Sequence, residues 1–417
     1  MAVYLIGFSL TALFACISRL YYIQYDNQQI VCQNSLITTK SVEKWKNDSL
    51  VNYIFTTISV YGIYIYYKIY GKEQTVSEEL LTTYRVVKDH KKIYIAFMAL
   101  AILPLFLIAG LRYGVGTDYF YTYSPNFYKI LMGESPYSEF GFNLLNRFIQ
   151  LFTKKDTGLF LVTGFIFAFL LVKTIIKHSE NVLLSLIVVL ISCIYFVSLN
   201  NVRQSIVSVI MLAAYPYFVK KETIKLLICC LCGMIFHYIA VAIFLVYLIC
   251  YFKIIQKYFP IICLLCIVSI PVISIVLKEI LMHTKYSYFF TSHFYNHKST
   301  IVLILYTSFF FVLFYLGMNR YRMKDRKCYI FLVFQFIAVC ISLVSFFIQA
   351  SEMISRITQF FLIYQVLAVP YVVTKLKNTN YRFLFVSVYI EAYTIYMVYY
   401  IIIMKYHEVL PYVSIFH

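Results

Sequence analysis

Gly110-Leu-Arg-Tyr-Gly-Val-Gly-Thr-Asp-Tyr-Phe-Tyr-Thr-Tyr123 follows directly on an apolar run, Ile93 to Ala109, which is long enough to cross most of a bilayer. Polar, charged and flexible residues therefore arrive together at the end of an expected membrane span. Charged side chains are costly at such a place, so they indicate a function there. A loop that carries an aromatic belt would explain the tyrosines. It would not explain Arg112 and Asp118 on either side of a glycine pair.

The side chains of this stretch suit a ligand that carries both phosphate and sugar. An arginine offers a planar fork of donors to phosphate oxygens, and an aspartate offers an acceptor or a base. Glycines let the backbone bend and let a ligand approach closely, while tyrosine rings with hydroxyl tips suit sugars. The residues concerned are Arg112, Gly114, Gly116, Asp118, Tyr119, Tyr121 and Tyr123.

The composition of the chain is that of a membrane protein. Of its 417 residues, 62% are hydrophobic and only 13% are charged, and the mean hydropathy is +0.78. A soluble domain of this length would need far more charged surface. The net charge of +18 comes from basic residues scattered among short loops, which is typical of positive-inside orientation. The expected partners are therefore membrane lipids and lipid phosphates, not nucleic acid.

Apolar runs of near-spanning length recur along the whole chain and predict an all-α, polytopic helical bundle. We expect about 11–13 transmembrane helices in a single domain that covers residues 1–417. The runs are Ala2–Tyr22, Leu50–Ile69, Ile93–Leu111, Thr157–Ile176, Val182–Leu199, Val202–Val219, Ile224–Phe252, Phe259–Val276, Ile301–Gly317, Tyr329–Ile348, Ile357–Val373 and Phe383–Met404.

Basic loops set the expected orientation. The clearest cytoplasmic signal is Arg320 to Lys327. With the other basic loops also inside, a main outer loop at residues 112–156 and a second outer loop at 281–298 face outward. This scheme closes only if Ile224–Phe252 crosses an even number of times, which predicts a break close to His237. A continuous tilted helix would instead invert the chain downstream.

Three arginines stand at the outer ends of expected spans: Arg112, Arg203 and Arg356. An arginine just inside a helix start gains from a bound phosphate, because the helix N-terminus itself attracts anions. Each could also reach lipid headgroups. Three on one face favour a function, so we expect them to converge on one outward-facing pocket of pyrophosphate size, with Gln204 beside Arg203.

Two residues are candidates for receiving a proton from an attacking hydroxyl, Asp118 and His237. The aspartate lies beside glycines that hold it close to a sugar, and we expect Arg112 to keep it ionised. The histidine has the better intrinsic pKa but lies deep in an apolar run. If neither acts, Glu134 or Glu139 in the outer loop remains. Cysteines lie mostly in apolar runs and no metal motif is present, so no metal or other cofactor is expected.

At these residues the chain resembles the EpsG family of Wzy-like polysaccharide polymerases. The stretch that contains Arg112 and Asp118 is similar to the family's R-x-x-V-G-x-D-Y signature. The supporting segments, in order, are Asn201-Val-Arg-Gln204, Phe236-His237, Ser355-Arg356 and Leu410-Pro-Tyr412. Leu50–Ile69 and its flanking loops are longer than expected in the family.

The resemblance implies a GT-C-like membrane glycosyltransferase that needs neither metal nor nucleotide-sugar. Such an enzyme lies in the bacterial inner membrane with its active site on the outer face. It transfers a growing O-antigen, capsule or exopolysaccharide chain from undecaprenyl pyrophosphate to a new lipid-linked repeat unit. A flippase and a chain-length regulator are candidate partners. The expected catalytic residues are Asp118 and His237, and the expected substrate or pyrophosphate ligands are Arg112, Arg203, Arg356, Gly114, Gly116, Tyr119, Tyr123 and Gln204.

Other functions share some of these features. A flippase or transporter for lipid-linked sugars should show two related halves and a charged central path, neither of which the sequence indicates. An O-antigen-type ligase would use the same donor with a different acceptor, and the sequence separates it poorly from a polymerase. A membrane acyltransferase should carry an early cytoplasmic histidine motif, which is absent.

Overall fold

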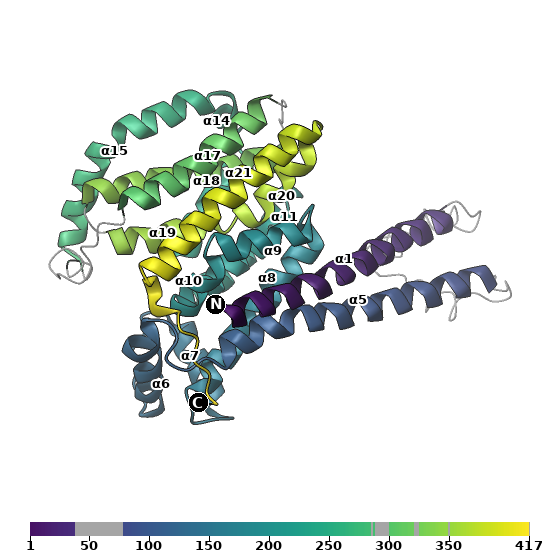
Figure 1. Ribbon diagram of the computed structural model, residues 1–417, viewed down its shortest axis with the longest axis horizontal. Coiled ribbons are helices and arrows are strands. Elements are labelled where there is room, and N and C mark those ends of the chain that lie inside the picture. The colour runs from purple at the N-terminus through teal and green to yellow at the C-terminus, as the bar shows by residue number, and fades with distance from the viewer. Residues whose placement is uncertain (38–77, 285–286, 288–299, 321–324, 349–350, 417) are drawn as a thin grey trace. The chain divides into compact units, whose positions relative to one another are not determined.

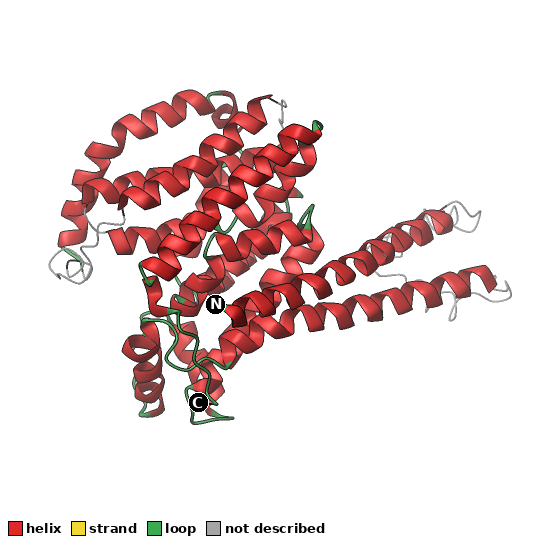
Figure 2. Ribbon diagram, viewed as in Figure 1, coloured by secondary structure: helices red, strands yellow, loops and turns green. Residues whose placement is uncertain are grey.

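The computed structural model describes residues 1–37, 78–284, 287, 300–320, 325–348 and 351–416 (Figure 1). Apart from one isolated bridge between Arg112 and Ser414, this part of the chain contains helices and loops without strands (Figure 2). An all-α fold is confirmed.

The helices before residue 201 are α1 (Ala2–Ile37), α5 (Glu78–Gly110), the π-helical turn η1 (Tyr119–Tyr123), α6 (Ser124–Leu131), α7 (Phe140–Gln150), α8 (Thr157–His178), α9 (Val182–Ile191) and α10 (Ile194–Asn200). Those that follow are α11 (Val202–Val219), α12 (Thr223–Met234), α13 (Ile239–Ile249), α14 (Lys253–Lys257), α15 (Phe259–Met282), α17 (Thr300–Arg320), α18 (Arg326–Ile348), α19 (Ser351–Leu362), α20 (Gln365–Lys375), α21 (Thr379–Met397), η3 (Val398–Ile403) and η4 (Tyr406–Glu408).

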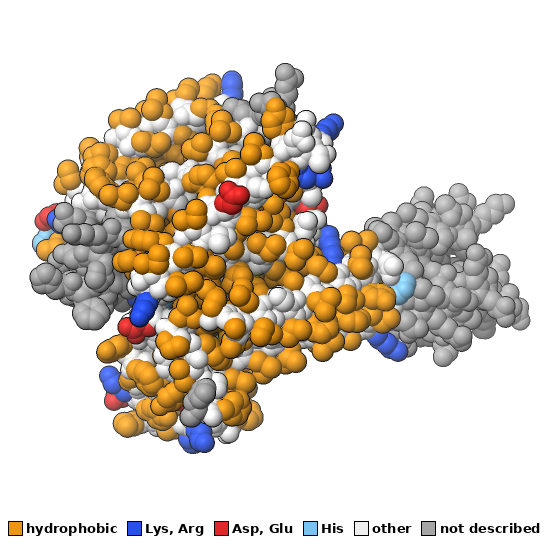
Figure 3. Space-filling model, viewed as in Figure 1, with side chains coloured by type: hydrophobic (Ala, Val, Ile, Leu, Met, Phe, Trp, Pro, Cys, Tyr) orange, Lys and Arg blue, Asp and Glu red, His pale blue; other side chains and the backbone are white. Residues whose placement is uncertain are grey.

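Nine helical segments of the described residues are long and apolar enough to cross a membrane, or up to ten if one bent pair counts as a span. Helices satisfy their own backbone hydrogen bonds, which lipid cannot do for them. Hydrophobic side chains accordingly cover most of the face seen in Figure 3. The protein is an integral, multi-pass membrane protein. The expected span at Leu50–Ile69 lies outside the described residues.

Two apolar runs are not straight helices. The run expected at Val182–Leu199 is the bent pair α9 and α10, whose axes differ by 53°. Cys193 stands at the bend with a φ of 61°. The long run Ile224–Phe252 is also interrupted, because α12 ends at Met234 and α13 begins at Ile239. The break close to His237 is therefore confirmed.

The chain divides into two compact units. One contains Leu10–Ala101, where parts of α1 and α5 pack together, with the Ser18 hydroxyl donating to the Tyr94 carbonyl at 3.0 Å. The other contains Met1–Ser9 and Ile102–His417. Every candidate site residue belongs to this larger unit, so the site can be described within it.

Candidate functional site

The loop between α5 and η1 turns sharply at two glycines. Gly114 has a φ of 63° and Gly116 a φ of 99°, backbone values that residues with a side chain rarely adopt. A Cβ added to Gly116 would lie 2.9 Å from the Leu199 carbonyl oxygen, at the end of α10. The close approach that this glycine allows is therefore to the protein's own backbone. It brings the motif loop against the α10–α11 junction.

The C-terminal tail, residues 405–416, pairs with the same loop. The backbone N–H groups of Tyr113 and Thr117 donate to the carbonyls of Val413 (2.9 Å) and His407 (3.0 Å). In return the Ile415 N–H donates to the Leu111 carbonyl at 2.9 Å. Figure 1 shows the C-terminus close to α7 and the end of α5. The last residues of the chain thus hold the motif loop in place.

We expect Gly116→Ala to destabilise the protein by roughly 1–3 kcal/mol more than Gly133→Ala. Gly133 is a matched control, since its φ is 96° but nothing lies within 4 Å of an added Cβ. Both variants carry the strain of positive φ, and only Gly116→Ala also meets the α10 backbone. Thermal unfolding in detergent measures the difference. Equal losses would show that the approach to α10 is not required.

Asp118 forms an ion pair with Arg356 from α19. Its carboxylate Oδ2 lies 3.4 Å from the arginine Nη1, and the two side chains are 17% and 22% exposed. The Asp118 backbone N–H donates to Oδ1 of Asn200 at 2.7 Å. The backbone is therefore fixed by the end of α10 while the carboxylate stays accessible. Asp118 pairs with Arg356, and not with Arg112 as expected.

A second ion pair joins Arg203, in the first turn of α11, to Glu139 in the loop before α7. Arg203 Nη1 donates to Glu139 Oε2 at 2.8 Å, and the carboxylate also accepts from the Ser138 hydroxyl at 2.9 Å. The guanidinium lies over the Tyr137 ring, 4.7 Å from its centre. The glutamate side chain is only 6% exposed, against 24% for the arginine. Cation–π contact and charge together fix the direction of this arginine.

Tyr123 is buried beside Arg203 and is affected by the charges of Asp118 and Arg356 as well. Its ring is 3% exposed, and its hydroxyl accepts the backbone N–H of Arg203 at 3.5 Å. Burial raises the pKa of the phenol, as does the charge of Asp118, while Arg203 and Arg356 lower it. All three charges thus act on one buried hydroxyl group. Segments that are far apart in the sequence meet here.

Arg112 is buried, unlike Arg203 and Arg356. Its side chain is 2% exposed, donates to the Ala109 carbonyl at 2.7 Å, and lies 4.5 Å over the Phe160 ring. Burial lowers the pKa of the guanidinium to about 10, which leaves it protonated at neutral pH. Its Nε and Nη2 have no hydrogen-bond partner among the described residues. The expectation of three arginines in one outward-facing pocket is therefore wrong for Arg112, whose guanidinium is buried against Phe160.

The expected tyrosine surface for sugars also changes. Tyr119 is 1% exposed and stacks on Phe160 with ring centres 4.2 Å apart, and Tyr123 is buried as described above. These two rings belong to the core beneath the loop. Tyr121 is 81% exposed, and Tyr113 is 51% exposed. Of the three tyrosines expected to suit sugars, only Tyr121 is therefore exposed, and Tyr113 joins it on the surface.

His237 lies in the break between α12 and α13. Its Nδ1 accepts the Ile239 N–H at 3.3 Å, and its ring lies 5.9 Å from Phe360 of α19. The Ile235 carbonyl in the same break accepts the N–H of Gly141 at 3.1 Å. The break therefore packs against the segment that carries Glu139.

Gln204, the neighbour of Arg203, has its Oε1 buried without a hydrogen-bond partner in the described chain. A buried acceptor left unpaired next to Arg203 is suited to a ligand hydroxyl.

Sequence reasoning missed Asn200 and His407. The Nδ2 of Asn200 lies 2.8 Å from Nδ1 of His407, and because Asn200 Oδ1 accepts from Asp118, the amide nitrogen is the donor. His407 is therefore neutral, with its proton on Nε2, 3.4 Å from the Tyr400 hydroxyl. Burial, and then the charge of Arg356, lower the pKa of this imidazole to about 3. In the sequence, the only sign of His407 is its position just before the Leu410-Pro-Tyr412 segment.

Two arginines and two carboxylates around buried polar groups can bind a doubly charged anion and accept a proton. Arg203 uses Nη1 for Glu139, and its Nε has no hydrogen-bond partner among the described residues. An anion can thus be bound at Arg203 while the Glu139 carboxylate stays nearby. Over the described residues, no three His, Cys, Asp or Glu side chains gather as metal ligands would.

Comparison with known proteins gives one finding. The model of the EpsG family matches residues 95–414, which include both ion pairs, the helix break and most of the C-terminal tail. No curated protein and no solved structure matches the chain.

Proposed function

The chain belongs to the EpsG family, and from that premise and the two ion pairs we propose that it polymerises lipid-linked oligosaccharide repeat units. The donor is the growing glycan on undecaprenyl pyrophosphate, and the acceptor is a new lipid-linked repeat unit. The reaction takes place at the outer face of the bacterial inner membrane. Family membership supports a role in polysaccharide biosynthesis, and the arrangement of charges supports this reaction.

The proposed reaction exchanges one bond for another at a single carbon. A hydroxyl oxygen of the acceptor's terminal sugar attacks the anomeric carbon of the donor's reducing-end sugar. The bond from that carbon to the pyrophosphate oxygen breaks, and the pyrophosphate leaves on its lipid. The hydroxyl proton passes to a carboxylate of the site and then to solvent or to the leaving group.

Arg203 and Arg356 stabilise the leaving group. Negative charge grows on the pyrophosphate oxygens as the bond breaks, and donors already fixed in place stabilise it without reorganisation. Arg203 is held against Tyr137 and Glu139, and Arg356 is held near Asp118. The start of α11 adds backbone N–H groups that favour an anion.

Asp118 is the proposed proton acceptor. It is the more exposed of the two carboxylates, 17% against 6% for Glu139, and its backbone is fixed by Asn200. A base must lie within hydrogen-bond reach of the proton that it abstracts. Glu139 is enclosed by Ser138 and Arg203, so its more favourable role is to orient the arginine.

The observation that carries this proposal is that two arginine–carboxylate pairs, Arg356–Asp118 and Arg203–Glu139, both involve residues at the ends of helices next to the motif loop. The test uses the purified protein in nanodiscs with pyrophosphate-linked repeat units and no nucleotide-sugar. We expect a ladder of lengthened chains. In a deletion strain, lipid-linked single units should accumulate while long chains vanish. Movement of units between leaflets without a new glycosidic bond would instead support a flippase, and transfer only to another acceptor would support a ligase.

A further inference from the structure

An apolar groove runs between α17 and α21. Its volume is about 460 Å³. Its walls include Val302, Leu305 and Phe309 from α17, Ala392 and Ile395 from α21, and Tyr399 from η3. The hydroxyls of Tyr306 and Tyr393 do not make it polar, because they donate to backbone carbonyls (3.2 and 3.3 Å) and leave the rings as walls.

The groove leads to the candidate site. Val302, Tyr396 and Tyr399 also line a smaller hollow of about 20 Å³, whose other walls include Gln359 and Tyr400. Gln359 stands three residues after Arg356 on α19, so the two side chains share a face of that helix. Tyr400 contacts His407, which belongs to the network that holds Asp118. The narrow end of the groove therefore reaches Gln359 and Tyr400, which neighbour the residues of the Arg356–Asp118 ion pair.

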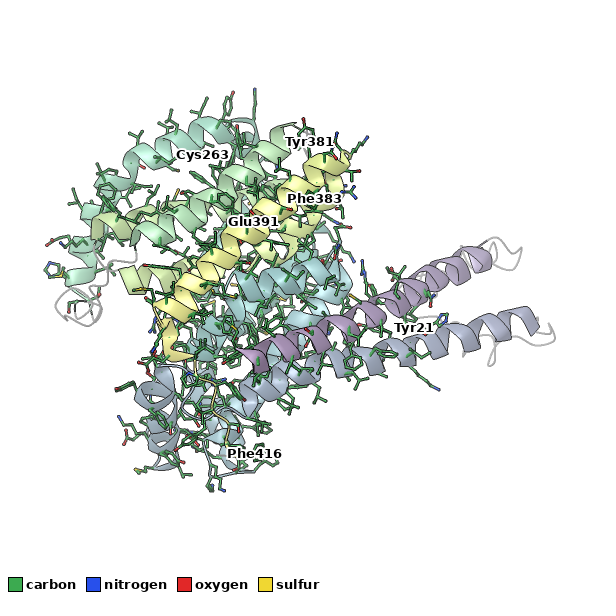
Figure 4. All side chains as sticks on the ribbon, viewed as in Figure 1. Tyr21, Cys263, Tyr381, Phe383, Glu391 and Phe416 are labelled. Carbon is green, nitrogen blue, oxygen red and sulfur yellow. The ribbon has the colours of Figure 1, made fainter. Side chains whose placement is uncertain are left out.

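The groove is shorter than one leaflet. From Ala392 to Tyr399, the residues of this segment that line it, the chain rises about 10 Å at about 1.5 Å per residue, and half of a bilayer's apolar core is about 15 Å. Glu391, labelled midway along α21 in Figure 4, immediately precedes Ala392. The groove thus lies in the half of the span Thr379–Ile403 that is nearer the site, and its far end lies near the middle of that span.

We propose that this groove binds the polyprenyl tail of the lipid pyrophosphate substrate, with the pyrophosphate at Arg356. The proposal rests on the proposed function, which supplies that lipid. An apolar tail gains no transfer energy by leaving one apolar medium for another, so the groove acts through shape and position. It fixes the depth of the tail and hence the position of the reacting anomeric carbon.

Leu305→Trp tests the groove, and Leu316→Trp is its matched control. Both leucines belong to α17 and are similarly exposed, 64% and 60%, but only Leu305 lines the groove. We expect Leu305→Trp to lower kcat/KM for chain growth about tenfold, because misplacing a substrate by about an ångström costs up to about a hundredfold. The loss should shrink with a donor whose polyprenyl tail is too short to reach Leu305. Leu316→Trp should polymerise as the unsubstituted protein does.

A second measurement does not depend on polymerisation. A C55 polyprenyl pyrophosphate without glycan, carrying a diazirine on its tail, is irradiated with the protein in nanodiscs. We expect label on residues 302–309 and 392–399, removed by unlabelled polyprenyl pyrophosphate but not by added phosphatidylglycerol, and reduced in Leu305→Trp only. Label spread evenly over the lipid-facing helices, or displaced equally by phosphatidylglycerol, would overturn the proposal.

The two measurements separate failure of the groove from failure of the proposed function. Label in the groove without chain growth would support the lipid site and refute the proposed polymerase activity. If Leu305→Trp does not change chain growth and the label lies elsewhere, the groove proposal is refuted and the polymerase activity is supported.

Discussion

Replacing Arg356 or Arg203 by alanine is expected to lower the rate of chain growth by on the order of a hundredfold or more, because each removes a fixed donor from the leaving pyrophosphate. The measurement is the initial rate of glycan lengthening in nanodiscs at equal amounts of folded protein. Lysine should restore part of the rate at both positions, since it keeps the charge. Restoration should be smaller wherever the substrate contact is bidentate.

Arg147→Ala is the matched control for these variants. Arg147 lies on α7, close in sequence to Glu139, and donates to the Ser135 hydroxyl at 3.0 Å in an exposed position. Removing this positive charge alters the same region without touching either ion pair. We expect the rate to stay unchanged. A loss equal to that of Arg203→Ala would mean that general surface charge, and not the paired arginines, governs the reaction.

The membrane architecture could be predicted from the sequence because lipid imposes a simple rule on it. Runs of about 20 apolar residues must be helices, and the break near His237 followed from the parity of the basic loops. The bend at Cys193 could not be predicted, since an apolar run of 18 residues gives no sign of an interruption. Residues 38–77 lie outside the described chain, so the number of spans in the N-terminal part stays a prediction.

The candidate site was partly predictable. Asp118, Arg203 and Arg356 meet because polar residues at neighbouring helix ends have few other places to lie. Which arginine pairs with which carboxylate depends on contacts between distant segments. Asp118 pairs with Arg356 across more than 200 positions, and no local pattern encodes that choice. The roles of these residues in binding and catalysis stay predictions.

Arg112 shows why a motif does not reveal which of its members contact the substrate. Its spacing from Asp118 suggested a pair, but the loop turns at Gly114 and Gly116 and directs the guanidinium inward onto Phe160. The C-terminal tail then covers the loop, with the Tyr412 hydroxyl donating to the Ile108 carbonyl at 3.0 Å. A contact between residues some 300 positions apart cannot be predicted from the local sequence.

Asp118→Asn is expected to lower chain growth by about 10²–10⁴-fold, the range by which a positioned general base accelerates a reaction. The amide keeps the size of the side chain and can still hydrogen-bond, but it cannot accept the hydroxyl proton. His237→Gln should cause a smaller loss, because the His237 imidazole packs beside Phe360 and its Nδ1 already accepts a backbone N–H. Both rates are measured on variants of confirmed abundance in the membrane.

A carboxylate that only orients Arg356 would give a different pattern. The double variant Asp118→Asn with Arg356→Gln distinguishes the two roles, because residues that act through one another do not add their losses. If Asp118 only holds the arginine, the double variant should be no slower than Arg356→Gln alone. If Asp118 is the base, its loss should persist in the absence of the arginine. Full chain growth by the Asp118→Asn variant would show that Asp118 is not the base. If the His237→Gln variant also grows chains at the full rate, the base must be Glu134 or Glu139. Glu139→Gln then becomes the decisive variant, since that carboxylate already lies 2.8 Å from Arg203.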